Sequence, residues 1–239
     1  MTIQYKSGIA NAYLIQAEDG YIAFDTGSIC DADVFTKILR ANRISPDSVK
    51  LIVISHEHDD HFVNANHMRE LTGAPILCHK NAVETISNGR TLPLYPRNKY
   101  GRWIVENLFK GDIPFTEVPC VSPDIVIQGD YDLRPYGIDA KLIETPGHSL
   151  GSISLITSRR EAYIGDVIVA QNPTIERPCC VAYFCYTEDT PTANAQILPN
   201  VQMLLESADV FYSGHGGPFS REEVERAYQE AIEEAAGIR

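Results

Sequence analysis

The sequence is poor in positive charge. It has 20 lysine and arginine residues against 32 aspartate and glutamate residues, which gives a formal net charge of -12 and a pI near 5.0. A protein that grips the phosphate backbone of a nucleic acid needs a basic face. We therefore expect no nucleic-acid partner.

A long apolar run and an N-terminal leader are also missing from the sequence. No segment approaches the roughly 20 apolar residues of a membrane-spanning helix. The first eight residues, MTIQYKSG, do not combine a basic region with an apolar segment. We expect no membrane partner and a cytoplasmic location.

Closely spaced cysteine pairs of the kind that bind metal are absent as well. The six cysteines form no Cys-x-x-Cys motif, and a disulfide framework is not expected without secretion. Cys179, Cys180 and Cys185 leave open a redox or soft-metal cluster, but buried thiols are the simpler interpretation.

Histidines and carboxylates, in contrast, are concentrated in one short segment. Residues 55–61, SHEHDDH, contain three histidines and three carboxylates and follow the apolar run 49–54, which predicts a buried strand. Strand ends are where α/β proteins place their chemistry. The first two histidines can point to one side of the loop, while Asp60 and His61 can reach a second point nearby. The pattern fits two adjacent metal sites.

Three more candidate ligands follow apolar, strand-like runs further along the chain. His148 lies in TPGHS (145–149), His215 lies in SGHGG (213–217), and Asp166 follows a glycine in the same way. Glycine lets the backbone turn sharply and approach a ligand closely. The alternative, a set of solvated surface turns, explains less well why five histidines and two aspartates share this placement.

The order His-x-His-x-Asp-His, followed by a distant His, an Asp and a His, resembles the metallo-β-lactamase-fold hydrolase superfamily. The resemblance implies an α/β fold, a four-layer αββα sandwich, as a single domain over residues 1–239. It assigns the first metal to His56, His58 and His148, and the second to Asp60, His61 and His215. It also implies that Asp166 bridges the two metals and that Asp25, in FDTG, supports the ligand loops from behind.

Imidazole and carboxylate ligands suit two zinc ions, with iron or manganese as alternatives. Two zinc ions would make hydroxide available near neutral pH for attack on a carbonyl, and Asp60 would orient it as the catalytic carboxylate. We therefore expect a dinuclear hydrolase of a thioester, ester or lactone. A mononuclear iron persulfide dioxygenase is the alternative, because those enzymes have a similar motif and resemble glyoxalase II. A non-catalytic binding relative is disfavoured, because every ligand position holds a suitable residue.

The expected branch is glyoxalase II-like without the C-terminal helical domain, because the chain ends after the helix expected at 221–236. The substrate does not follow from the branch. A Gly-Gly pair usual after the motif is replaced by FVNA at 62–65, and the tyrosine of lactonases three residues after the bridging aspartate is replaced by Val169. We expect a small-molecule substrate and leave a homo-oligomer open.

An irregular, lid-like insertion is expected at about 88–114, where glycines and prolines interrupt aromatic and basic residues. From Arg90 to Lys110 it has five basic residues and one acid. This local charge could recognise an anionic substrate, or the loop could face solvent or another subunit. The candidate substrate-binding residues are Arg97, Lys99, Arg102 and Trp103.

The remaining pattern predicts regular elements around these motifs. Strands are expected at 12–16, 21–24, 75–78, 124–128, 131–135, 141–144, 152–157 and 162–164. Helices are expected at 33–43, at 64–71, at 192–206 with a kink or break at Pro199, and at 221–236 with a Ser220/Glu223 capping box. Residues 170–190 are expected to be an irregular loop, and His67 and His79 to lie outside the metal site.

Overall fold

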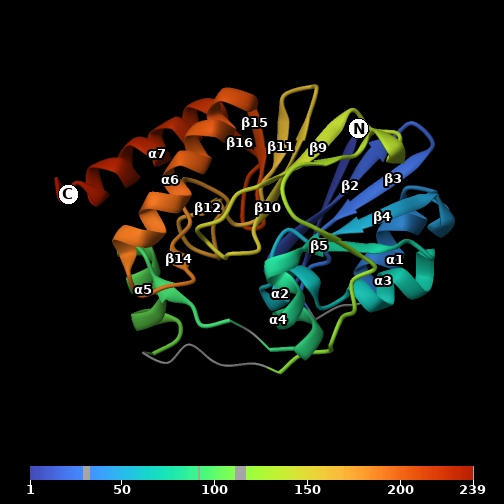
Figure 1. Ribbon diagram of the computed structural model, residues 1–239, viewed down its shortest axis with the longest axis horizontal. Helices are drawn as coiled ribbons and strands as arrows, with labels where there is room; N and C mark the ends of the chain where they lie inside the picture. Colours follow the sequence, from blue (N-terminus) through green and yellow to red (C-terminus); the bar gives the residue numbers. More distant parts are fainter. Residues whose placement is uncertain (29–32, 91, 111–116, 239) are drawn as a thin grey trace.

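Two six-stranded sheets lie face to face between two layers of helices (Figure 1). The structure is a computed structural model that describes residues 1–28, 33–90, 92–110 and 117–238. This architecture confirms the predicted αββα sandwich.

The first sheet is built from the N-terminal half of the chain. Its strands follow the spatial order β1 (Thr2–Ser7), β2 (Ala10–Ala17), β3 (Gly20–Phe24), β4 (Val49–Val53), β5 (Ile76–His79) and β7 (Ile125–Ile127). Strands β3, β4, β5 and β7 are parallel. Alternating residues of β4 face opposite layers: Leu51 and Val53 pack between the sheets, whereas Ile52 packs against the outer helices. Strand β1 was not predicted from the sequence.

The helices α1 (Asp33–Ala41), α3 (Ala65–Thr72) and α4 (Val83–Asn88) cover the outer face of this sheet, where Phe35, Leu39, Met68 and Ile86 share one core with it. The short helix α2 (Asp59–Phe62) precedes α3. Helix α3 ends at Gly73, whose φ of 74° places it in the left-handed region that ends many helices. Short 3-10 helices span Pro46–Ser48, Lys80–Ala82 and Arg134–Tyr136.

The second sheet comes from the C-terminal half. Its spatial order is β16 (Phe219–Ser220), β15 (Val210–Tyr212), β11 (Glu161–Tyr163), β10 (Ile153–Thr157), β9 (Ala140–Glu144) and β8 (Tyr131–Asp132). Helices α6 (Thr190–Ser207) and α7 (Arg221–Ala235) cover its outer face. Of the predicted kink or break at Pro199, the break is wrong, because α6 continues through this residue, and the kink stays a prediction. The capping box of Ser220 and Glu223 at the start of α7 is confirmed.

The edges of the two sheets are joined where strands of both halves end. Ile153 at the start of β10 donates its backbone N–H to the carbonyl of Ser55, just after β4, at 2.8 Å. Asn11 in β2 donates its backbone N–H to the carbonyl of Gly214, just after β15, at 2.7 Å. The loops at this edge are therefore held together by backbone hydrogen bonds from both sheets.

The predicted irregular insertion contains regular structure in its described part. Strand β6 (Tyr95–Pro96) pairs with β14 (Phe184–Cys185), and α5 covers Lys99–Asn107. The expectation of an irregular segment is wrong for α5. The helix was not predicted because it contains Gly101, and glycine is unfavourable inside a helix. Glycine is needed at this position because a Cβ would lie 2.1 Å from the carbonyl oxygen of Tyr183. The part of the insertion at residues 91 and 111–116 lies outside the described residues.

The second predicted loop, 170–190, also contains strands. β12 (Ile168–Ala170) pairs with β13 (Cys179–Val181), and β14 follows. β12 and β13 form a two-stranded sheet of their own, and β14 pairs with β6. Among the described helices, none is long and apolar enough to cross a membrane.

The Arg97 side chain is buried, with 4% of its surface exposed. Its guanidinium donates to the carbonyl oxygens of Ala182 at 2.6 Å and Val181 at 2.9 Å, and to Asn194 Oδ1 at 2.7 Å. These three bonds hold Arg97 within the protein, and a substrate contact for Arg97 stays a prediction. Arg97 fastens the insertion to the segment between β13 and β14.

We expect Arg97→Met to lower the free energy of unfolding by about 3 kcal/mol, because it removes three hydrogen bonds of a buried guanidinium. The matched variant Arg102→Met removes a more exposed guanidinium of the same insertion, which lies 3.5 Å from Glu234. It should change the free energy by no more than about 0.5 kcal/mol. Denaturant unfolding of both variants measures the difference, and equal losses would contradict this role for Arg97.

Candidate metal centre

The residues of the SHEHDDH motif lie at the carboxyl end of β4. His56 and His58 occupy the loop that leaves the strand, and helix α2 begins directly after His58. The helix carries Asp60 and His61, so its first turn directs these side chains to the same edge. The motif is thus placed at a strand end, as the sequence predicted.

The other three predicted ligands come from loops of the second sheet. His148 lies between β9 and β10, Asp166 between β11 and β12, and His215 between β15 and β16. All seven predicted ligand residues are brought together in three overlapping groups, each with its ligand atoms within 4.8 Å of one another.

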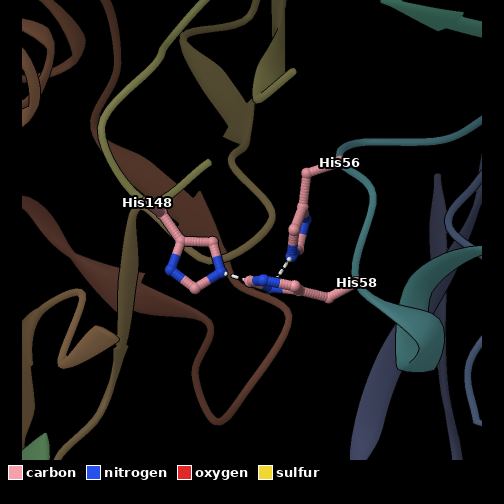
Figure 2. Close-up of side chains that lie close together, drawn as sticks. All are labelled: His56, His58 and His148. Atoms are coloured by element: carbon pink, nitrogen blue, oxygen red, sulfur yellow. Dashed lines mark hydrogen bonds between the residues drawn. The ribbon is translucent and has the colours of Figure 1, made fainter. Parts of the chain in front are cut away.

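His56, His58 and His148 form the first group (Figure 2). His58 Nδ1 lies 3.0 Å from His56 Nε2 and 2.8 Å from His148 Nε2. Burial is the main cause that lowers the pKa of each imidazole, in the case of His58 to about 3. Neutral imidazoles with converging nitrogens are suited to a metal ion, because a metal needs the lone pair that a proton would occupy.

Asp60, His61 and His215 form the second group. His215 Nε2 lies 3.2 Å from Asp60 Oδ2, and His61 Nε2 lies 3.6 Å from Asp60 Oδ1. Burial would raise the pKa of Asp60, but the two imidazoles outweigh it and lower the pKa to about 2.

The pKa values of the two histidines in the second group shift in the opposite direction to those in the first group. Burial lowers the pKa of His61 and of His215, but the neighbouring carboxylates, of which Asp166 acts most strongly, raise both pKa values well above the ordinary value. The carboxylates thus favour a positive charge at this group, which a bound metal ion would supply in place of a proton.

Asp166 lies between the two groups and forms the third group with His56 and His61. Its Oδ2 is 3.2 Å from His215 Nε2 and 3.7 Å from His148 Nε2, and its Oδ1 is 3.4 Å from His61 Nε2. Within the described residues, Asp166 Oδ1 and His61 Nε2 are both buried and make no hydrogen bond of good geometry. Buried polar atoms of this kind are costly without a partner, so the pair fits a site that a cation completes.

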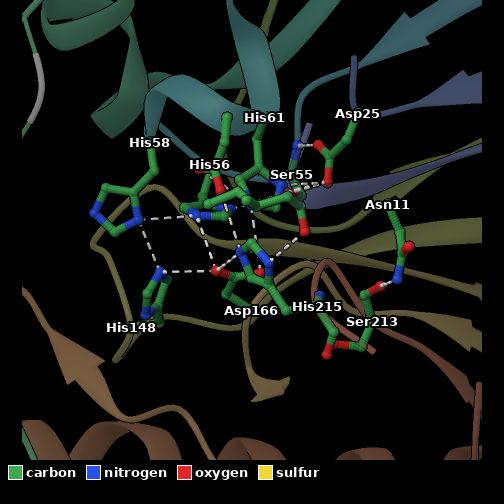
Figure 3. A network of polar contacts seen from close by, with 12 residues as sticks. Asn11, Asp25, Ser55, His56, His58, His61, His148, Asp166, Ser213 and His215 are labelled. Atoms are coloured by element: carbon green, nitrogen blue, oxygen red, sulfur yellow. Dashed lines mark hydrogen bonds and ion pairs between the residues drawn. The ribbon is translucent and has the colours of Figure 1, made fainter. Parts of the chain in front are cut away.

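Asp25 forms hydrogen bonds with both ends of the motif, Ser55 and His61 (Figure 3). Its carboxylate accepts hydrogen bonds from the backbone N–H of Ser55 at 2.7 Å, from Ser55 Oγ at 2.8 Å and from His61 Nδ1 at 2.8 Å. The His61 contact orients the ring so that Nε2 faces the site. Asp25 has a φ of 61°, a conformation rare outside glycine that the surrounding contacts maintain.

Backbone carbonyls orient two further histidines. His148 Nδ1 lies 3.0 Å from the carbonyl oxygen of Phe184, and His215 Nδ1 lies 3.1 Å from that of Ile9. A carbonyl can only accept, so each Nδ1 must carry a proton, and Nε2 is the ring nitrogen that faces the site and could bind a metal ion.

Glycine is required where the loops meet most closely. A Cβ on Gly214 would lie 2.2 Å from Asp166 Oδ1 and 2.5 Å from His61 Cε1. The glycine before His215 is therefore explained by the close approach that the sequence predicted.

Two supporting residues were missed by the sequence analysis. Glu57 is buried and accepts a hydrogen bond from Ser149 Oγ at 2.7 Å, which ties the motif loop to the His148 loop, and burial raises the pKa of Glu57. Asn11 donates to the carbonyl oxygens of Ser213 at 3.0 Å and Gly216 at 2.9 Å, which fixes the His215 loop. The position of Glu57 between two histidines was a signal, but nothing in the pattern showed that its carboxylate turns away from them.

The other predicted substrate-binding residues lie on α5. Lys99 Nζ is 2.5 Å from Glu230 and Arg102 is paired with Glu234, so two of the five basic residues of the insertion are paired with acids of α7. Trp103 is 45% exposed. A substrate contact for Lys99, Arg102 or Trp103 stays a prediction.

The residues set aside by the sequence analysis lie outside the three groups. His79 is buried and its Nε2 lies 2.8 Å from Glu144 Oε1, while His67 is half-buried on α3. No group of metal-ligating residues found in the described chain contains a cysteine. Cys179, Cys180 and Cys185 are buried free thiols.

Comparison with known proteins agrees with this centre. The family model of the metallo-beta-lactamase superfamily matches residues 6–215. A probable metallo-hydrolase of Methanocaldococcus jannaschii is 27% identical over 213 residues, which cover 87% of each chain. A probable metallo-hydrolase of Bacillus subtilis is 25% identical over 162 residues, 66% of each chain.

Solved structures share the fold. The crystal structure of the B3 metallo-beta-lactamase BLEG-1 has a TM-score of 0.67 at 18% identity and covers 93% of this chain and 95% of its own. The metallo-beta-lactamase SMB-1, solved with mercaptoacetic acid, has a TM-score of 0.67 at 17% identity and covers 100% of this chain and 97% of its own. The family match over most of the chain, the shared fold and the His and Asp metal-binding groups lead to one conclusion: the protein belongs to the metallo-beta-lactamase superfamily and is a metallo-hydrolase.

Proposed function

We propose that the protein hydrolyses a thioester, ester or lactone with two metal ions, preferably zinc. The observation that carries the proposal is the place of Asp166, whose carboxylate borders both ligand groups at 3.2 to 3.7 Å from their nitrogens. One carboxylate in this position suits two neighbouring ions better than one. The relatives described as probable metallo-hydrolases support the reaction class.

The seven ligand residues would hold the metals in two groups that share Asp166. His56, His58 and His148 supply nitrogens to one group, and Asp60, His61 and His215 supply ligands to the other. Divalent ions held there would bring the pKa of a water close to neutrality and polarise a substrate carbonyl.

Asp60 is the residue best placed to orient the attacking water. Its side chain is 16% exposed, against 8% for Asp166, so it lies nearer the open side of the centre. The lowered pKa of Asp60 keeps the carboxylate ionised and able to accept a hydrogen bond from that water.

We expect protein purified without added metal to contain about two metal ions per chain, mostly zinc. A chelator should remove both ions, lower the melting temperature and abolish hydrolysis of a panel of thioesters, esters and lactones, because metal bound to the folded state stabilises it. Zinc should restore all three properties. One iron per chain, with oxygen consumption on a persulfide, would contradict the hydrolase and favour the dioxygenase.

Asp25→Asn should weaken zinc affinity by about 10- to 100-fold, because an amide cannot accept all three hydrogen bonds and His61 loses its orientation. The matched variant Asp19→Asn, in the exposed turn before β3, should bind zinc as the wild type does. Competition with a chromophoric chelator measures both affinities. Unchanged affinity in Asp25→Asn would show that the ligand loops need no support from this carboxylate.

Asp60→Asn should fold normally but lose activity by about 100-fold or more, because it removes both a ligand charge and the acceptor for the attacking water. Asp59→Asn changes the neighbouring carboxylate of the same helical turn, which belongs to none of the three groups, and should stay within a few-fold of wild type. Steady-state kinetics with measured metal content test this pair. Full turnover in Asp60→Asn would refute the assigned role.

A further inference from the structure

A hollow of about 500 Å³ lies where the insertion meets the start of α6 and the end of α7. Figure 1 shows α5, the helix of the insertion, beside the start of α6. The wall of the hollow includes Arg97 and Arg102 of the insertion, Thr190, Pro191 and Asn194 of α6, and Glu234 of α7. None of these residues belongs to the three groups of candidate metal ligands. The hollow is therefore separate from the metal centre.

Arg97 brings a buried positive charge to this wall. Its three hydrogen bonds go to neutral acceptors, two backbone carbonyls and Asn194 Oδ1. The ion pairs that the described residues of the insertion form are those of Lys99 and Arg102, so Arg97 has no carboxylate partner among the described residues. A buried charge is costly without an opposite charge nearby. An anion in the hollow would supply that charge.

The wall also holds N–H groups that no described residue uses. A guanidinium has five N–H donors, and the three bonds of Arg97 leave two of them without a partner in the described chain. Because Arg97 can only donate, the oxygen of the Asn194 amide faces it, and the amide NH₂ group is left without a described partner. Arg102 adds a second guanidinium, whose contact with Glu234 is 3.5 Å long. The unused donors thus belong to three neighbouring side chains of one wall.

The start of α6 adds the partial positive charge of a helix N-terminus. This helix has 18 residues, the side chain of its cap residue Asp189 makes no capping hydrogen bond, and its first turn contains no acid. The Asp189 carboxylate accepts a hydrogen bond from the Thr192 hydroxyl instead. A helix N-terminus favours a negative group beside it. Since Thr190 and Pro191 of the first turn line the hollow, the helix acts in the same direction as the two guanidinium groups.

We propose that the hollow binds a small molecule through an oxyanion group, a carboxylate or a phosphate, held by Arg97, Arg102 and Asn194. Planar guanidinium groups match the oxygen atoms of both anions, and hydrogen bonds between charged partners are stronger than neutral ones. The ligand is bound there and not cleaved, because no candidate metal ligand lines the hollow. The inference goes beyond the proposed hydrolysis and does not depend on it.

Arg102→Met should weaken the binding of inorganic phosphate to the zinc-loaded protein about tenfold, because it removes a guanidinium from the wall. The matched variant Lys99→Met removes the same charge from the same helix, at a side chain that pairs with Glu230 and does not line the hollow. It should stay within about twofold of wild type. Titration calorimetry at constant ionic strength measures the affinities, and phosphate bound at the zinc ions contributes equally in all three proteins.

Asn194→Asp keeps an acceptor for Arg97 but gives this guanidinium a carboxylate partner. The new charge takes the place of the anion and repels it, so phosphate should bind about tenfold more weakly or worse. Phosphate should also raise the melting temperature of this variant less than that of wild type, because a ligand stabilises the folded state in proportion to its occupancy. The variant tests the site without removing a hydrogen bond of Arg97.

Acetate serves as the second probe. A higher affinity for phosphate indicates a phosphorylated ligand, a higher affinity for acetate indicates a carboxylate, and either result supports the site. Equal phosphate affinity in wild type, Arg102→Met and Asn194→Asp overturns the inference, because the anion would then bind at the metal centre alone. A loss in Lys99→Met as large as that in Arg102→Met overturns it too, because the overall charge would then decide the affinity. Wild-type protein that binds neither probe also refutes the site, whereas the hydrolase is tested separately by its substrate panel.

Discussion

The concentration of polar side chains at the joined edges of the two sheets is the constraint on which the rest of the structure depends. Five imidazoles and two carboxylates lie buried or nearly buried within a few ångströms. Ionisable groups are costly in such a place unless charge is balanced and each polar atom has a partner. The His61 and Asp166 atoms that make no good hydrogen bond show that the protein side chains alone do not complete the balance. A bound cation supplies what is missing.

These groups must be held in fixed positions, and the fold does so through buried strands, side-chain hydrogen bonds and backbone hydrogen bonds between the two sheets. The ligands stand on short loops whose ends are fixed by buried strands. Asp25 and Ser55 tie the ligands of the first sheet together, and Asn11 reaches across to the loop of His215. Backbone hydrogen bonds between the two halves then fix the distance between the two ligand groups. The metal centre therefore depends on the packing of one sheet on the other.

Much of this could be predicted from the sequence because the signals are local. Apolar runs ended by His, Asp and Gly predict strands with ligands at their ends, and the strand and helix patterns agree with the structure at most positions. What could not be predicted depends on contacts distant in sequence. Nothing near Gly101 shows that it packs on the carbonyl of Tyr183 within a helix, and nothing near Arg97 shows that its partners are the carbonyls of residues 181 and 182. A count of charges over residues 90–110 likewise does not include Glu230 and Glu234 of α7, which pair with Lys99 and Arg102.

The insertion therefore acts on the site through its backbone contacts more than through its charge. An ion pair such as Lys99 with Glu230 is exposed on the lysine side and screened by solvent, so it contributes little to a field at the metal centre. The buried hydrogen bonds of Arg97, in contrast, fix the carbonyls of Val181 and Ala182. The carbonyl of Phe184, two residues further along the chain, orients His148. A shift of Arg97 would thus move the backbone at Ala182 and, through the Phe184 carbonyl, the candidate ligand His148. Since variation in such a segment would change how His148 is held, it offers a route by which one ligand set can be adjusted to different substrates.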